Sequence, residues 1–137
     1  MSNYGLDVLE VDECSALLHT QRVGRMALVD EDPAVLPVVY ALLDGDIVFR
    51  TAPGAKLVAA VLGREVVFEV DHFDADARAG WSVNVIGKAA EIVHPVELER
   101  ARALGLRPWA GDARDRFVRV TPERITGRRV RDGAVGA

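Results

Sequence analysis

The longest stretch with β-strand character reads WSVNVIGKAAEIV and covers residues 81–93. Its first half alternates apolar and polar side chains, which predicts a strand with one buried face. The alternation changes phase near Gly87, and glycine tolerates the bulge or sharp bend that such a change implies. Because a long strand bent at a glycine is what a sheet needs to close on itself, this stretch predicts a small β-barrel.

Five more strands are expected around this one. Apolar and β-branched runs bounded by turn-forming residues predict strands at residues 23–29, 35–42, 47–51, 66–71 and 117–130. The hairpin signal Asp44-Gly45 joins two of them directly, which favours antiparallel neighbours. Residues 72–80 are polar enough to predict a loop. The predicted fold class is therefore mainly β: a six-stranded antiparallel barrel with small helices.

Three short helices are expected between the strands. Asp12 is expected to cap the first helix, in which Cys14 packs with leucines on the apolar side. An apolar run at residues 57–62 predicts a helix packed against the sheet, and His94-Pro95 predicts the start of a third helix. Residues 1–10 are expected to form an extended arm and residues 132–137 to be frayed, within one domain that spans residues 1–137.

Composition narrows the classes of function. The net charge of −4 argues against a nucleic-acid partner. No apolar run approaches the roughly 20 residues that cross a bilayer, and the first residues lack the features of a signal peptide, so we expect a cytoplasmic protein without a membrane partner. The single cysteine excludes an internal disulfide, and the three histidines lack the spacing of zinc ligands, so no metal site is expected.

The segment FRTAPGAK, residues 49–56, has the composition of an anion site. It joins a β-branched run to an apolar helical run and carries Arg50, Thr51 and Lys56. Backbone amides at a helix start, together with these side chains, form a plausible cradle for a phosphate. Ten of the 17 basic residues, all arginines, lie from Arg100 onward, which fits either a solvated surface or an electropositive rim for an anionic ligand.

Taken in order, these segments resemble the pyridoxamine 5′-phosphate oxidase-like, FMN-binding split β-barrel family, especially its short actinobacterial-type members. The corresponding segments are residues 23–27, 36–47, 49–56, 67–71, 80–87 and 125–128. The resemblance implies a split β-barrel and a homodimer with two cofactor sites in the clefts between its subunits.

The resemblance also implies a set of cofactor-binding residues. One subunit supplies a phosphate grip and a strand along the isoalloxazine ring, and the partner subunit supplies a third segment. These groups correspond to Arg50, Thr51 and Lys56, to Pro37, Val38, Val39 and Tyr40, and to Trp81, Ser82 and Val83. From the residues alone, Trp81 fits a core or interface position as well, and Tyr40 fits a strand position with a packed ring and an exposed hydroxyl.

The function that the resemblance implies is an FMN-binding oxidoreductase that transfers a hydride or electrons to an unidentified small molecule. Two alternatives stay open: a reductase that uses an 8-hydroxy-5-deazaflavin cofactor, and a non-catalytic flavin- or haem-binding protein. A true vitamin B6 oxidase is not expected, because the chain is shorter and lacks that enzyme's C-terminal arginine and histidine pattern. Catalytic side chains cannot be assigned, since hydride transfer to a flavin needs no dedicated acid or base.

Overall fold

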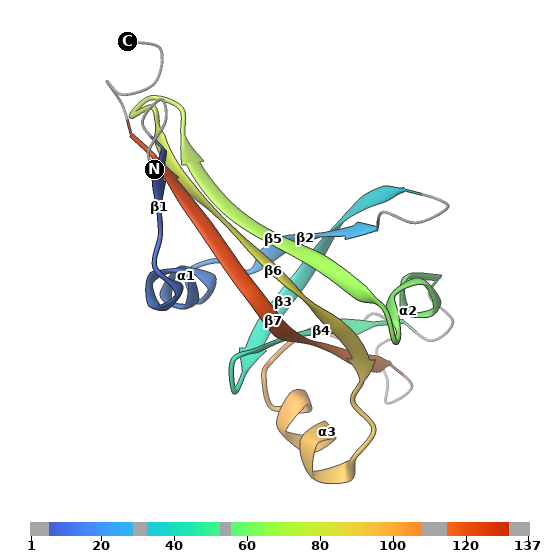
Figure 1. Cartoon of the computed structure of the whole chain (residues 1–137). Helices are drawn as coiled ribbons and strands as arrows, with labels where there is room; N and C mark the ends of the chain where they lie inside the picture. Colours follow the sequence, from blue (N-terminus) through green and yellow to red (C-terminus); the bar gives the residue numbers. More distant parts are fainter. Residues whose placement is uncertain (1–5, 29–32, 53–55, 108–114, 132–137) are drawn as a thin grey trace.

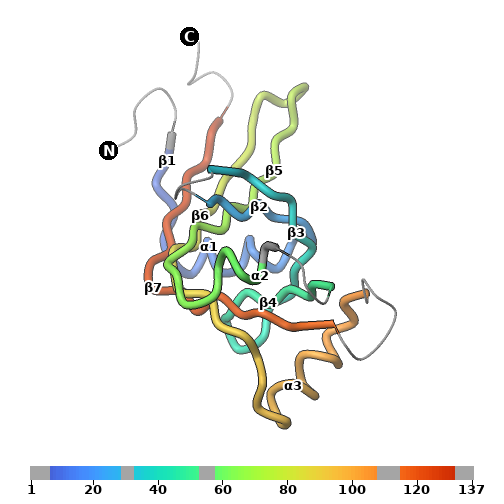
Figure 2. The backbone as a smooth tube through the Cα atoms, turned by 90° about the vertical axis from the view of Figure 1, so that its right-hand side faces the viewer, coloured from blue at the N-terminus to red at the C-terminus, as the bar shows by residue number. Residues whose placement is uncertain are grey.

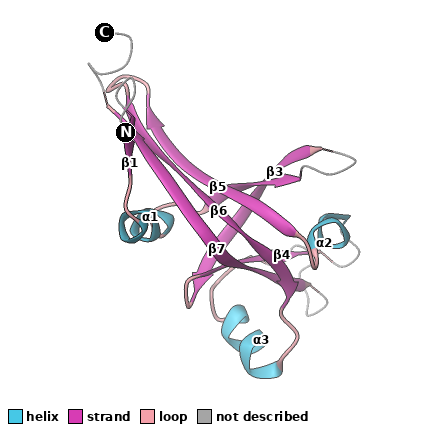
Figure 3. Ribbon diagram, in the orientation of Figure 1, coloured by secondary structure: helices cyan, strands magenta, loops and turns pink. Residues whose placement is uncertain are grey.

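The computed structural model describes residues 6–28, 33–52, 56–107 and 115–131. Figure 1 shows long crossing strands with three short helices around them, and Figure 3 shows the same elements by type. In chain order the elements are β1 (Leu6–Val8), α1 (Val11–Leu18), β2 (Val23–Leu28), β3 (Ala34–Leu43), β4 (Asp46–Thr51), α2 (Lys56–Val61), β5 (Glu65–Asp74), β6 (Ala79–Glu91), α3 (Pro95–Arg102) and β7 (Arg116–Val130).

Six of the strands close into an antiparallel barrel, as expected. The sheet runs β1-β7-β4-β3-β2-β5-β6, and β6 pairs back onto β7. Figure 2 shows the strands around the central space, with α1 and α2 close to it and α3 further out. β1 is a seventh strand, which pairs with β7 outside the ring and lies within the segment expected to be an extended arm.

The closure depends on β6 and β7, which pair from Gly80 with Val130 to Glu91 with Val118. The register shifts between Ile86 and Gly87, so the predicted irregularity at this glycine is confirmed. A Cβ atom on Gly87 would lie 2.0 Å from the carbonyl oxygen of Thr121, a distance that a side chain cannot accept. The glycine is therefore required by the close approach of the two backbones.

Two local expectations were wrong. The segment expected to be a loop, residues 72–80, is largely strand, because β5 and β6 form one long hairpin around a turn at residues 75–78. The Asp74 carboxylate accepts the amides of Asp76 and Ala77 at 3.0 and 3.1 Å, which satisfies the tight turn. Glu10 precedes α1 without a side-chain cap, so Asp12 lies inside the helix and does not cap it.

The core has two parts that lie on opposite sides of β4. Inside the barrel, the side chains of Ile47 and Phe49 join Phe68 and the α2 residues Val58 and Val61. The alternate residues of β4 face outward, since successive strand side chains point to opposite faces. Val48 therefore packs in a second cluster with residues of α3 and β7, namely Ala101 and Phe117.

The helices behave as short packing elements. The Nδ1 of His94 accepts a hydrogen bond from the amide of Val96 at 3.3 Å and so caps α3, as its position before Pro95 predicted.

Among the described residues, no helix has the length and apolar character needed to cross a membrane.

Gly87→Ala tests the backbone contact that closes the barrel. We expect a loss of about 2–4 kcal/mol in the free energy of unfolding, because the methyl group collides with backbone rather than with a movable side chain. Urea unfolding followed by tryptophan fluorescence measures it. Gly63→Ala is the control, since Gly63 has φ +74° but no atom within 4 Å of a Cβ, and should lose only about 1–2 kcal/mol. Equal losses in the two variants would contradict a steric role for Gly87.

Candidate functional site

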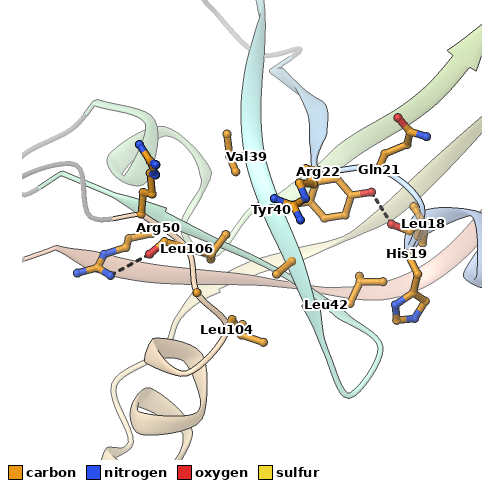
Figure 4. Close-up of a pocket in the computed structure, with 13 residues that line it drawn as sticks. Leu18, His19, Gln21, Arg22, Val39, Tyr40, Leu42, Arg50, Leu104 and Leu106 are labelled. Carbon is orange, nitrogen blue, oxygen red and sulfur yellow. Dashed lines mark hydrogen bonds between the residues drawn. The ribbon is translucent and has the colours of Figure 1, made fainter.

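A pocket of about 770 Å³ lies against β3 and β4. Its other walls come from the α1–β2 linker (residues 19–22) and from the chain after α3 (residues 104–107), as Figure 4 shows. The described lining residues are Leu18, His19, Gln21, Arg22, Val39, Tyr40, Ala41, Leu42, Arg50, Leu104, Gly105, Leu106 and Arg107. A volume of this size suits a cofactor or small ligand.

One part of the lining is apolar. Val39 is 48% exposed because it faces outward from β3, between the inward-facing Val38 and Tyr40. Leu104 and Leu106, from the chain after α3, also line the pocket. Apolar walls of this kind accept a flat ring system without leaving polar groups unpaired.

The polar part of the lining is basic. His19, Arg22, Arg50 and Arg107 line the pocket, and no aspartate or glutamate occurs among the described lining residues. Since like charges reinforce one another in a concave surface, this arrangement favours an anionic ligand.

Arg50 is held in place by its neighbours. Its Nε donates to Asp115 Oδ2 at 2.9 Å, and its Nη1 donates to the carbonyl oxygen of Leu106 at 3.2 Å. The guanidinium also lies 4.9 Å from the ring centroid of Phe117. These contacts fix the chain after α3 against β4, and a ligand phosphate at Arg50 would share the guanidinium with Asp115.

Tyr40 joins the barrel interior to the α1–β2 linker. Its hydroxyl donates to the carbonyl oxygen of Leu18 at 2.5 Å, and its backbone amide donates to the carbonyl oxygen of Arg22 at 2.9 Å. The ring packs edge-on against Phe68, with centroids 5.1 Å apart. Burial raises the pKa of Tyr40 to about 12, so the hydroxyl remains a donor at neutral pH.

The structure brings three of the predicted cofactor-binding residues to this pocket: Val39, Tyr40 and Arg50. Thr51 is buried, and as the next residue of β4 it points to the face opposite Arg50. Its hydroxyl bonds to the carbonyl oxygen of Ala52 at 3.4 Å. The side chain of Lys56 lies outside what the structure describes.

The other predicted residues do not line the pocket. Val38 is buried on the inner face of β3, while Pro37 is exposed on the outer face. Trp81 and Val83 are buried in the core of their own chain, with exposed fractions of 6% and 0%, and Ser82 between them is half-buried on the outer face. A role for these residues in binding a cofactor stays a prediction.

The sequence reading missed the two segments that form the other walls. The sequence analysis assigns no binding role to residues 19–22 or to residues 104–107. Two basic side chains within four residues of a helix end were a weak signal. No local pattern in the sequence indicates that residues 19–22 lie beside β3.

A second charged cluster lies on the outer face where β2 pairs with β5. One Nη of Arg25 contacts Glu69 at 3.1 Å and Asp71 at 2.9 Å. Burial, together with the neighbouring Asp71, raises the pKa of Glu69 to about 7. Within the described ranges, no three His, Cys, Asp or Glu side chains come together as ligands for a metal ion.

The closed six-stranded antiparallel barrel with small helices is the architecture of split-barrel proteins. A model of the pyridoxamine 5′-phosphate oxidase family matches residues 10–129. The chain belongs to this family.

Individual proteins are similar to this chain in sequence or in structure. The uncharacterized protein Rv0080 of Mycobacterium tuberculosis is 37% identical over 128 residues, which cover 89% of this chain and 84% of Rv0080. The FAD-binding protein of Mycobacterium smegmatis has a similar structure, with a TM-score of 0.80, 36% identity and coverage of 91% of this chain and 100% of that one. A FAD-binding protein of Mesorhizobium loti has a TM-score of 0.73 and 27% identity, covering 93% of this chain and 98% of its own.

Tyr40→Phe tests the bond that holds the linker. At pH 7 we expect a loss of about 1–2 kcal/mol in the free energy of unfolding, because the buried carbonyl of Leu18 loses its donor. Because folding raises the pKa of Tyr40 to about 12, the difference in the free energy of unfolding between the parent and the variant should be fully present below about pH 10. It should decrease as the pH rises through about 12. Urea unfolding at several pH values measures it. Equal stability of parent and variant at pH 7 would show that the hydroxyl bond contributes nothing.

Proposed function

We propose that this chain binds a flavin nucleotide, FMN or the FMN portion of a larger flavin, in the pocket beside β3 and acts as an oxidoreductase on a small molecule. The observation that carries the proposal is one pocket of about 770 Å³ that pairs an apolar wall with a polar lining in which the charged side chains are all basic, among the described residues. A flavin nucleotide has the same two parts, a flat apolar ring and an anionic phosphate. The FAD-binding protein of Mycobacterium smegmatis, 36% identical, supports a flavin as the ligand class.

In this proposal the apolar and the basic walls contact different parts of the flavin. Val39, Leu104 and Leu106 pack against the ring and exclude water from it, and Arg50 donates to the phosphate. The Tyr40 hydroxyl already donates to Leu18, so it serves to position the linker and not to contact the ring. A bound flavin supplies two-electron transfer, and the chain supplies binding and orientation.

Val39→Trp tests the pocket by filling it. Since Val39 is 48% exposed, a larger side chain there does not have to enter the core, and the fold should be retained. We expect the affinity for FMN, measured by quenching of flavin fluorescence, to fall about tenfold or more as the indole occupies the space of the ring. Val96→Trp, at an exposed position of α3 outside the lining, is the matched control. If both variants bind FMN like the parent, the flavin does not occupy this pocket.

We further propose that the chain works as a homodimer, as the family resemblance implies. Val23, Val35 and Val39 are at least 48% exposed on the outer face of β2 and β3, and Val23 pairs directly with Val39. Exposed apolar side chains gathered on one sheet face favour a protein partner. Because Val39 also lines the pocket, a partner on this face would cover the pocket from outside.

Light scattering tests this proposal. A dimer has twice the chain mass of 14.9 kDa. Val35→Asp, which places a charge on the same face outside the pocket lining, should shift the protein toward the monomer, because an unpaired charge is costly to bury in an interface. A parent protein with the mass of a single chain would contradict the dimer.

A further inference from the structure

The pocket has two basic ends that lie on opposite sides of β3. In the sheet, β3 is flanked by β2 and β4. Tyr40 of β3 pairs with Phe49, the neighbour of Arg50, and its amide donates to the carbonyl oxygen of Arg22 just before β2. Adjacent strands lie about 4.8 Å apart, so the backbones of Arg22 and Arg50 are about 10 Å apart. Figure 4 shows the two side chains on either side of the β3 ribbon.

The end beside the α1–β2 linker combines an apolar floor with polar side chains. Leu18 and Leu42 line the pocket here, and both pack against the barrel core. The linker adds His19, Gln21 and Arg22 to the lining of the same end. In Figure 4 these side chains lie together, on the opposite side of β3 from the chain after α3. This end therefore suits a small molecule with an apolar body and an anionic group.

The two basic side chains of this end are available to a ligand. Arg22 and His19 are exposed, and neither forms a side-chain hydrogen bond or ion pair with any residue that the structure describes. Arg50, at the other end of the pocket, already donates to the buried carboxylate of Asp115. An anion at Arg22 would therefore gain a charge-assisted hydrogen bond without breaking an existing contact.

The linker is held in position before any ligand arrives. Tyr40 accounts for two anchors, through its hydroxyl on Leu18 and its amide on Arg22. The Gln21 amide nitrogen donates to the Thr20 hydroxyl at 3.3 Å, which uses one of its two hydrogens. A segment fixed in this way loses little conformational freedom on binding.

FMN by itself leaves the linker end unused. In the proposed function Arg50 receives the single phosphate of FMN, and Val39 packs against the ring, which is uncharged when oxidised. A molecule that exchanges electrons with the flavin has to lie against this ring, with reacting atoms about 3–3.5 Å apart. The linker end adjoins that position, because Val39 pairs with Val23, the residue that follows Arg22.

We propose that the substrate is a small carboxylate with a flat apolar body, and that Arg22 binds its carboxylate with the help of His19 and Gln21. The inference rests on the proposed function, because the flavin ring forms the surface on which the flat body lies. The planar guanidinium of Arg22 matches the two oxygens of a carboxylate, and Gln21 adds a neutral donor. Leu42 contacts the apolar body. Arg22 thus determines specificity by charge and takes no part in the electron transfer.

Benzoate and benzamide test this proposal, since they share a shape and differ in charge. Each is titrated into the FMN-loaded protein, in which the bound phosphate occupies the Arg50 end, and binding is followed by calorimetry. We expect the parent to bind benzoate about tenfold or more tightly than benzamide, as a charge-assisted contact implies. A parent that binds the two equally would overturn the proposal.

Two variants locate the contact. Arg22→Ala should reduce the preference for benzoate to less than about twofold. Arg102→Ala, which removes an exposed arginine of α3 outside the pocket lining, should retain it. Both should bind FMN within about twofold of the parent. A preference that survives Arg22→Ala shows that the carboxylate binds elsewhere, and a loss of FMN affinity in Arg22→Ala assigns this arginine to the cofactor; either result overturns the proposal.

The failure of the flavin proposal is distinguishable from the failure of the carboxylate site. If the parent binds no FMN, the proposed flavin function fails, and the benzoate and benzamide titrations are made on the protein without FMN. A preference for benzoate that Arg22→Ala abolishes and Arg102→Ala retains supports the carboxylate site there. Equal binding of benzoate and benzamide overturns the site as well.

Discussion

The barrel depends on one backbone contact, the approach of Gly87 to Thr121 where β6 crosses β7. A Cβ atom would lie 2.0 Å from a carbonyl oxygen there, so the crossing exists only with glycine. The residues of β7 just before this point, 116–120, pair with β4. That pairing fixes the alternation of β4, which turns Phe49 into the barrel and Arg50 toward the pocket. The position of the basic group in the site thus follows from a steric constraint on another strand.

Much of this fold could be predicted from the sequence because its signals are local. Apolar and β-branched runs between turn-forming residues indicated five of the barrel strands, period-two alternation indicated the sixth, and the change of phase at Gly87 indicated the bulge. The β5–β6 hairpin was missed because residues 72–78 are polar and exposed on both faces, so no alternation signals a strand there. β1 was missed as a strand because three residues are too few to show a period, and its only support is its pairing with β7.

The site was less predictable, for a physical reason. Val39, Tyr40 and Arg50 come together because two neighbouring strands carry them, and neighbouring strands are visible in the sequence. The other walls depend on contacts between distant residues: Tyr40 with Leu18, and Arg50 with Leu106 and Asp115. Contacts between distant residues produce no periodic pattern in the sequence. Trp81 shows the converse case, because the phase of β6 places its ring inside the barrel whatever its chemical suitability for stacking on a cofactor.

The double anchoring of the linker by Tyr40 has a consequence for motion. The hydroxyl that holds Leu18 is buried with the ring in the barrel core, and the amide that holds Arg22 belongs to a strand at the centre of the sheet. The linker therefore cannot leave its place unless the barrel itself opens. The amide of Tyr40, which donates to the carbonyl oxygen of Arg22, should therefore exchange with solvent through global unfolding and not through local fraying, so this wall of the pocket and the core form a single cooperative unit.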